Sequence, residues 1–297
     1  MARSPLIRYF TPLRYPGGKA KLAPFVKLLL RENGLLDGHY IEPYAGGASV
    51  ALSLLMNEYV SHVHINDLDP AVHAFWHSAL FETNALCRMI RDKRVTAAEW
   101  RRQRAIHDDS RSSSKLERGF STLFLNRTNR SGIICSGGMI GGVKQGGKWK
   151  IDARYNKADL VRRVERVAAF RDRISLYNLD ARVLIRSLVR RVPTRSLFYL
   201  DPPYYVKGKH RLYANFYEHA DHATVADQIT KSGRSWMVSY DNAPEIRSLY
   251  TGYRKLVYRL GYSAADRYDG AEVMFFSDDL RLPSVRNPTT VRDVDAA

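Results

Sequence analysis

The chain lacks most of the features that mark secreted, membrane-spanning and metal-binding proteins. It has only two cysteines in 297 residues, and Cys87 and Cys135 form no CxxC pair and match no metal-ligand spacing. No run approaches the roughly 18 apolar residues that a membrane span requires, and residues 1–10 contain arginines but no apolar signal-peptide core. No internal repeat is present. These absences predict a soluble cytoplasmic protein with reduced thiols, no metal and no membrane partner.

Acidic residues are scarce relative to basic ones. The chain has 47 Lys+Arg against 30 Asp+Glu, which gives a formal net charge of +17. Residues 82–175 alone contain 22 Lys+Arg against 10 Asp+Glu and therefore hold +12 of that charge. A strongly basic soluble chain favours polyanions through long-range attraction and counterion release. The charge therefore predicts a nucleic-acid partner that contacts the middle of the chain.

Short apolar runs bounded by turn residues alternate with helical patterns. Helices are predicted at 21–31, at 48–59, and from a cap at Asp221 to Gly233. Strands separated by helices indicate a mostly parallel, doubly wound α/β sheet. The seven predicted strands lie near 39–42, 63–66, 174–178, 197–200, 235–240, 254–260 and 272–277.

A long segment interrupts this alternation. Residues 76–170 show no strand-helix alternation and carry the excess charge, so we expect an inserted, mostly helical domain there. Residues 1–75 and 171–285 would then form the sheet domain. Residues 286–297 are polar and aperiodic, which predicts a loose tail.

The strongest motif is Leu-Phe-Tyr-Leu-Asp-Pro-Pro-Tyr at 197–204, an apolar strand that ends in an acid, two prolines and an aromatic. The exocyclic amine of a nucleic-acid base is a poor nucleophile because its lone pair is delocalised into the ring. A catalyst that modifies it must therefore accept hydrogen bonds from its N–H groups. The Asp201 carboxylate and the Pro202 carbonyl are two such acceptors, and prolines keep the backbone extended. Tyr204 offers a face for a flipped base. A proline-terminated strand with a surface acid is the structural alternative.

A second motif is strand, small-residue loop and helix, His-Tyr-Ile-Glu-Pro-Tyr-Ala-Gly-Gly-Ala-Ser-Val at 39–50. Such a loop lets a ligand approach the backbone at the carboxyl edge of a parallel sheet. The loop is not GxGxxG, which disfavours a dinucleotide. Asp67 follows the next strand, where an acid binds ribose hydroxyls in nucleoside-binding sheets. Cofactor binding is therefore favoured over a simple glycine turn.

A third motif is Arg-Tyr-Pro-Gly-Gly-Lys at 14–19. Its Gly-Lys pair suggests a phosphate loop, but the chain has Leu13 and Ala20 where the Walker pattern requires Gly and Ser or Thr. Nucleotide hydrolysis is therefore disfavoured. Lys19 could instead bind the carboxylate of an amino-acid-like cofactor.

Together, and in their chain order of 14–19, 39–50 and 197–204, the three motifs resemble those of the Dam-type (class alpha) DNA adenine N6-methyltransferases. The resemblance covers most of the chain and implies a Rossmann-like, seven-stranded, S-adenosylmethionine-dependent methyltransferase sheet with an inserted target-recognition domain. It implies that Asp201, Pro202 and Tyr204 are catalytic. The residues it implies for binding S-adenosyl-L-methionine are Tyr15, Gly17, Lys19, Glu42, Pro43, Tyr44, Ala45, Gly46, Asp67, Asp180, Ala181 and Asp201.

The resemblance also implies DNA contacts. Residues 124–132 resemble the family's segment beside the flipped adenine, while residues 136–147 lack its target-reading sequence, so no recognition site is assigned. Arg and Asn suit base edges in the major groove, and phosphate contacts are an equal alternative. The implied DNA-binding residues are Asn126, Arg127, Asn129, Arg130, Lys144 and Lys148 in the insertion, and Lys207, Lys209 and Arg211 in a basic loop after 201–204.

Alternative chemistries differ in what they require. Methylation at cytosine C5 needs a cysteine nucleophile, usually after proline, whereas Cys87 follows Leu86 and Cys135 follows Ile134. Cytosine N4 stays open because its amine needs the same acceptors, although Asp201 favours adenine. An RNA target and a catalytically silent DNA-binding protein also remain open.

The resemblance thus implies methyl transfer from S-adenosyl-L-methionine to the N6 amine of adenine in a specific double-stranded DNA sequence, by base flipping and direct displacement. We expect a monomer or weak dimer on DNA, with a cytoplasmic, nucleoid-associated location.

Overall fold

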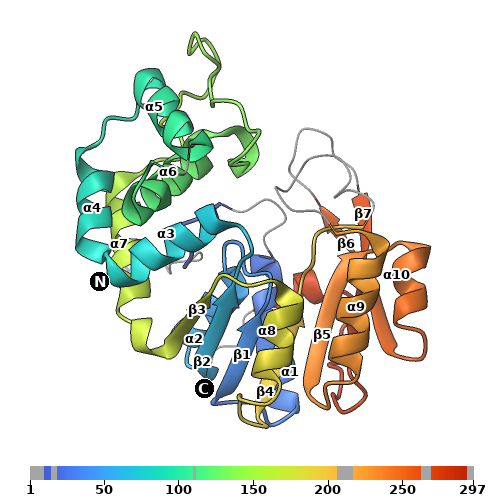
Figure 1. Ribbon diagram of the computed structural model, residues 1–297. Coiled ribbons are helices and arrows are strands. Elements are labelled where there is room, and N and C mark those ends of the chain that lie inside the picture. Colours follow the sequence, from blue (N-terminus) through green and yellow to red (C-terminus); the bar gives the residue numbers. More distant parts are fainter. Residues whose placement is uncertain (1–9, 15–18, 110–111, 206–216, 262–268, 293–297) are drawn as a thin grey trace, which may run out of the picture.

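One seven-stranded sheet organises the chain (Figure 1). The computed structural model describes residues 10–14, 19–109, 112–205, 217–261 and 269–292, with the backbone alone at 259–261 and 269–270. The seven predicted strands are confirmed as β1 (Gly38–Glu42), β2 (Val60–Asn66), β3 (Ile174–Tyr177), β4 (Ser196–Leu200), β5 (Ser235–Asp241), β6 (Arg254–Gly261) and β7 (Asp269–Phe276).

The strand order is β3-β2-β1-β4-β5-β7-β6. The first five strands in this order are parallel, and β7 runs antiparallel to both β5 and β6. The order reverses between β1 and β4, and ligands of open α/β sheets bind at the carboxyl ends of the strands beside such a reversal. The topology therefore brings the segments after β1 and β4 to one edge.

Helices cover both faces of the sheet. Helices α1 (Ala23–Glu32) and α2 (Ser49–Met56) pack on one face. Helices α8 (Ala181–Leu188), α9 (His219–Thr230) and α10 (Pro244–Leu249) cover the other. Each amphipathic helix buries its apolar stripe against the strands. This arrangement confirms the α/β class and the Rossmann-like methyltransferase fold.

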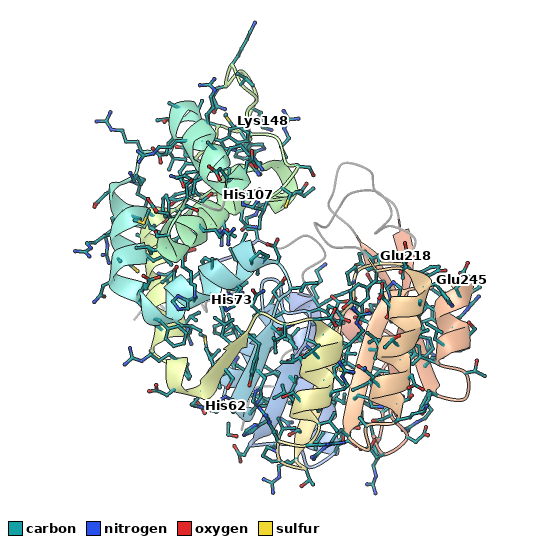
Figure 2. All side chains as sticks on the ribbon, in the orientation of Figure 1. His62, His73, His107, Lys148, Glu218 and Glu245 are labelled. Atoms are coloured by element: carbon teal, nitrogen blue, oxygen red, sulfur yellow. The ribbon has the colours of Figure 1, made fainter. Side chains whose placement is uncertain are left out.

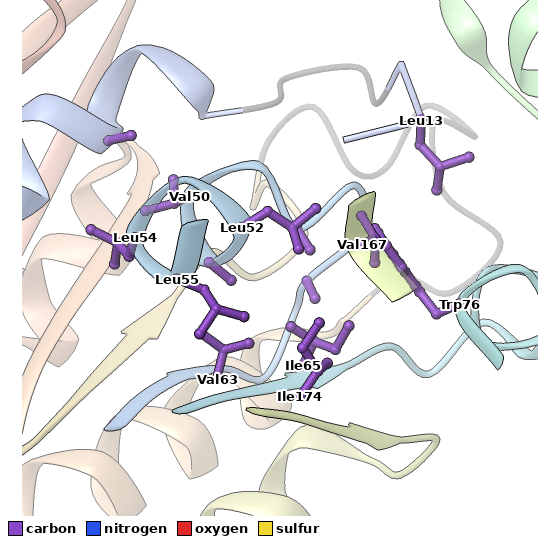
Figure 3. Packing of buried hydrophobic residues seen from close by; sticks show 14 of the residues in the cluster. Leu13, Val50, Leu52, Leu54, Leu55, Val63, Ile65, Trp76, Val167 and Ile174 are labelled. Atoms are coloured by element: carbon purple, nitrogen blue, oxygen red, sulfur yellow. The ribbon is translucent and has the colours of Figure 1, made fainter. Parts of the chain in front are cut away.

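Alternation along β2 shows how the core forms (Figure 3). Val63 and Ile65 are fully buried, with Val63 beside Leu55 of α2 and Ile65 beside Ile174 of β3. Burying such a side chain stabilises the fold by about 1.5–3 kcal/mol. The alternate residue His64 lies on the opposite face, where its ring stacks on Tyr177. The apolar period of two in the sequence thus sets which side of β2 meets α2.

Between β2 and β3 the described residues form five α-helices, which Figure 1 shows beside the sheet. α6 is buried from Gly119 onwards and packs against α3, where a side chain at Gly119 would collide with the Ala74 carbonyl. Helix α3 starts after its cap Asp69 and runs across residue 76, the predicted start of the insertion. The helices are α3 (Pro70–Phe81), α4 (Thr83–Asp92), α5 (Ala97–Asp108), α6 (Lys115–Thr128) and α7 (Lys157–Ala168).

Two local predictions are wrong. Asp221 is not the cap of α9: Glu218 is the N-cap, and Asp221 completes a capping box three residues later, because its carboxylate accepts from the Glu218 amide. The predicted tail, residues 286–297, is not loose over its described part, 286–292. Val291 packs against the core, and a 3-10 turn (Pro288–Thr290) contacts α1, because even a polar segment gains by burying its few apolar side chains.

Candidate active site

Acidic residues follow three neighbouring strands at their carboxyl ends. Glu42 ends β1, Asp67 follows β2 and Asp201 follows β4. Parallel strands bring these ends to one edge of the sheet, beside the reversal in strand order. The structure therefore brings together the acids of two separate sequence motifs.

Asp201 is fixed through one of its two carboxylate oxygens. Its Oδ1 accepts a hydrogen bond from the Ser239 hydroxyl at 2.7 Å and lies 3.5 Å from the Lys19 ammonium. Within the described part of the chain, these are its side-chain hydrogen-bond and ion-pair partners, and the side chain keeps 25% of its surface exposed. Burial raises the pKa of Asp201 to about 6, although Lys19 opposes this shift. Oδ2 is left to accept a hydrogen bond from a substrate.

Pro202 and Tyr204 occupy an irregular segment directly after β4. Pro202 is buried, and its carbonyl is used by no hydrogen bond between described residues. The Tyr204 ring is only 6% exposed, and its hydroxyl donates to Glu272 Oε1 at 2.9 Å. Tyr204 is therefore enclosed, and its ring could stack on a flipped base only if the side chain became more exposed.

Lys19 binds two carboxylates in this structure. Its Nζ lies 2.5 Å from Glu272 Oε2 on β7, and both side chains are almost completely buried. Burial disfavours the ammonium, but Asp201 and Glu272 outweigh it and hold the pKa of Lys19 above its usual value. The predicted contact of Lys19 with a cofactor carboxylate therefore competes with these two acids.

The loop after β1 is held against β2. The Gly46 amide donates to Asp67 Oδ2 at 2.9 Å, and the Ala45 amide donates to the Asn66 carbonyl at 2.8 Å. Gly46 and Ala48 both have a positive φ, which turns the chain sharply into α2. The side-chain amide of Asn66 also donates to the carbonyl of Pro43. These bonds fix the predicted cofactor loop beside Asp67.

The pKa values of the acids at this loop are raised. Burial raises the pKa of Glu42 to about 8, although bonds from the Tyr40 hydroxyl and the Ala51 amide favour its ionised form. Burial likewise raises the pKa of Asp67 to about 7. A ligand that donates hydrogen bonds or brings positive charge would stabilise the ionised forms of both.

The remaining predicted cofactor residues in the described part of the chain lie after β3 and in the loop after β1. Asp180 caps α8, and Arg182 lowers its pKa through hydrogen bonds to both carboxylate oxygens. Ala181, the first residue of α8, is buried. The hydroxyl of Tyr44 lies 3.3 Å from that of Tyr217. The predicted residues Tyr15, Gly17, Lys207, Lys209 and Arg211 lie outside the described residues.

Three of the predicted DNA-binding residues are internal. Asn126 is fully buried and bonds to the Arg14 amide and carbonyl and to the Gly132 carbonyl. Arg127 donates to the Pro12 carbonyl, and Asn129 is fully buried with its amide bonded to backbone carbonyls. The prediction of DNA contact by these three side chains is therefore wrong for this conformation, because their polar atoms satisfy buried backbone groups.

Arg130, Lys144 and Lys148 are exposed, as DNA contact requires. Lys148 lies at the outer end of the inserted helices, far from His62 on the sheet (Figure 2). Beside it, Trp149 is 62% exposed, and the Lys148 ammonium lies 5.9 Å from its ring centroid. An exposed tryptophan among cations suits a surface that binds nucleic acid.

Three residues of the site carry no role predicted from sequence. Ser239 and Glu272 reach the site from β5 and β7, and Asn66 joins the loops after β1 and β3. One signal was available for Glu272: it is an acid within the otherwise apolar run 271–276. Nothing in the local sequence marks Ser239.

No cluster of three or more potential metal ligands occurs among the described residues. In the same part of the chain, no helix is both long and apolar enough to cross a membrane.

The strand order and the acids at the carboxyl edge define a methyltransferase of the Rossmann-like class. A family model described as D12 class N6 adenine-specific DNA methyltransferase matches residues 15–261, and the chain belongs to this family of DNA adenine methyltransferases. No curated protein matches. An rRNA methyltransferase, aviRa from Streptomyces viridochromogenes, is 13% identical with a TM-score of 0.34, over 85% of this chain and 83% of that one. A likeness this low says nothing about substrate.

Proposed function

We propose that this enzyme uses S-adenosyl-L-methionine to methylate the N6 amine of adenine in a specific double-stranded DNA sequence, after flipping the base out of the duplex. The observation that carries the proposal is the placement of Asp201. Its unshared oxygen Oδ2 lies at the same sheet edge as the Glu42–Gly47 loop and Asp67. One acceptor for a base amine and one cradle for a nucleoside cofactor thus adjoin.

The residues at this edge fit the proposed cofactor. Asp67 would accept hydrogen bonds from its ribose, and the sharp turn at Gly46 would let it approach the backbone. The positive charge of a sulfonium and an amine would also stabilise the ionised forms of the buried acids. When bound, the cofactor supplies an electrophilic methyl group.

The catalytic contribution of the chain is to hold the amine. Asp201 Oδ2 and the Pro202 carbonyl accept the two N6 hydrogens, which localises the nitrogen lone pair towards the methyl group. The bound cofactor would supply the methyl group and would leave as its neutral thioether, and the methylated N6 would lose one proton to water. Ser239 keeps the Asp201 carboxylate oriented throughout.

The partner proposal rests on the exposed cations. Arg130, Lys144 and Lys148 would neutralise phosphates of a duplex. We propose the same role for Lys207, Lys209 and Arg211, which lie outside the described residues. An adenine must leave the base stack to reach Asp201, because the carboxylate lies at the edge of the sheet and not on an element that could enter a groove of the duplex. We propose that one chain, or a weak dimer, acts on each site.

The test is transfer of a tritiated methyl group from S-adenosyl-L-methionine to unmethylated duplex DNA and, in parallel, to RNA, followed by nucleoside analysis. The proposal expects label in N6-methyladenine, and none with Asp201→Ala although that variant still binds DNA. Label in N4-methylcytosine, label only in RNA, or unchanged turnover by Asp201→Ala would each overturn it.

A further inference from the structure

Glu272 is a buried carboxylate beside the catalytic segment. Its side chain is 1% exposed. Its Oε2 accepts from Lys19 Nζ at 2.5 Å and from the Tyr258 hydroxyl at 2.7 Å, and its Oε1 accepts from the Tyr204 hydroxyl at 2.9 Å. A buried charge requires such partners. One side chain therefore ties the residue that ends the 14–19 motif to the tyrosine of the 201–204 motif.

The two contacts of Lys19 are unequal. Its ammonium lies 2.5 Å from Glu272 but 3.5 Å from Asp201, and it lies 5.3 Å from the centroid of the Tyr204 ring. Of the two carboxylates, Glu272 is therefore the closer partner of the Lys19 ammonium. Without it, the ammonium would be left with Asp201. If Lys19 moved onto Asp201, it would compete with a substrate amine for the carboxylate.

We propose that Glu272 is a positioning residue for methyl transfer: it holds Lys19 and Tyr204 in place, so that the Asp201 carboxylate stays available to the adenine amine. The inference rests on the proposed function. It adds a role for β7, a strand from which no residue of the reaction was predicted.

A buried ion pair that only supports the fold is the alternative explanation. Both roles predict a less stable protein when Glu272 is replaced. Only the positioning role predicts, in a protein that still folds, a lower kcat with nearly unchanged KM values. Among the described residues, the titratable groups that face Asp201 are Lys19, Glu272, Glu42, Tyr40, Tyr199 and Tyr258. Without the charge of Glu272, Lys19 dominates, and the pKa of Asp201 falls.

The experiment compares Glu272→Gln and Glu272→Asp with Glu245→Gln. The last variant makes the same acid-to-amide change at an exposed position of α10 (Figure 2). For each full-length protein we would measure kcat, the KM for DNA and for S-adenosyl-L-methionine, the pH dependence of kcat, and the melting temperature. The parent enzyme is assayed first, because a parent without transfer would refute the proposed function and not this role of Glu272.

For Glu272→Gln we expect kcat to fall about 100-fold, the loss typical of a misplaced catalytic group, with both KM values within about threefold. The acid limb of its pH profile should move to lower pH. Glu272→Asp keeps the charge, so its kcat should fall only about tenfold, with the acid limb unmoved. Glu245→Gln should match the parent.

A folded Glu272→Gln protein with parental kcat, or with reduced kcat and an unmoved acid limb, would overturn the proposal. If Glu272→Gln does not fold, Glu272→Asp decides instead. A lower kcat in a folded Glu272→Asp protein supports the role, and a parental kcat refutes it.

Discussion

The Ser239 hydroxyl, on β5, donates a 2.7 Å hydrogen bond to Oδ1 of Asp201, which follows the neighbouring strand β4. The same hydroxyl lies 2.9 Å from that of Tyr199 on β4. Ser239 is completely buried, so its position is set by the sheet itself. The orientation of the proposed catalytic carboxylate is therefore part of the rigid core.

Ser239→Ala should lower kcat about tenfold, because a hydrogen bond to a charged group contributes about 1.5 kcal/mol or more. The bond also lowers the pKa of Asp201, so its loss should move the acid limb of the rate profile to higher pH. Steady-state kinetics from pH 5 to 8 test both effects. A variant with parental kcat and an unmoved profile would remove Ser239 from the site.

The pH dependence of the parent enzyme follows from Asp201. The pKa of Asp201 is raised to about 6. Only the ionised carboxylate can both accept hydrogen bonds from the base amine and pair with the charge of Lys19. Activity should therefore be full above this value and fall as the pH drops through about 6. Measurement of kcat with saturating DNA checks this, with Asp201→Asn as control. An acid limb near pH 4 would contradict it.

Cofactor binding should release protons near neutral pH. Glu42 and Asp67 have pKa values raised to about 8 and about 7, so the cofactor-free protein holds protons that a cationic ligand expels. Because these values are raised by folding, the same groups make the free energy of unfolding decrease as the pH rises from about 5 to 8. Calorimetric titration at pH 7 in two buffers of different ionisation enthalpy measures the release. Equal heats in both buffers would contradict it.

Asn126→Ala should destabilise the fold and leave exposed DNA contacts intact. Asn126 bonds three backbone groups at buried and partly buried positions, and each buried group left unsatisfied costs about 1–3 kcal/mol. Denaturant unfolding should show a loss of at least about 2 kcal/mol. The matched control is Lys148→Ala at an exposed position, which should unfold like the parent. Parental stability with altered sequence selectivity would instead restore Asn126 as a base-reading residue.

Trp149 gives a direct optical probe of the proposed DNA-binding surface. Trp76 and Trp236 are buried and Trp100 is half-buried, whereas Trp149 is 62% exposed. Duplex DNA should therefore protect the fluorescence from acrylamide quenching, and Trp149→Phe should remove most of that protection. In the same assay Lys148→Ala should reduce the salt dependence of binding by about one unit of slope. Quenching that DNA leaves unchanged would place the duplex elsewhere.

The strands were predictable because buried strands produce apolar runs that any single sequence displays, as 197–200 and 235–240 do. The acids Glu42, Asp67 and Asp201 were also predictable, because each follows such a run directly. Ser239 and Glu272 were not, because their roles depend on which strands become neighbours in the sheet. No local pattern encodes that order.

The error at Asn126, Arg127 and Asn129 has a different cause. Amide and guanidinium groups that suit base edges equally suit buried carbonyls, so residue type alone does not separate the two uses. The distinction needs the tertiary position of α6, which buries its last ten residues. Asn129, the C-cap residue of α6, is also buried, and Arg130 directly after it is exposed.

The central claim is that Asp201 directs a methyl group onto adenine in a defined duplex sequence. Its most direct test is expression of the chain, and of Asp201→Ala, in a strain that lacks adenine methylation, followed by sequencing of the genomic DNA for modified bases. If Asp201 has this role, we expect N6-methyladenine at one short sequence motif with the parent chain and at none with Asp201→Ala. Modified cytosine, or adenine methylation that persists in Asp201→Ala, would contradict it.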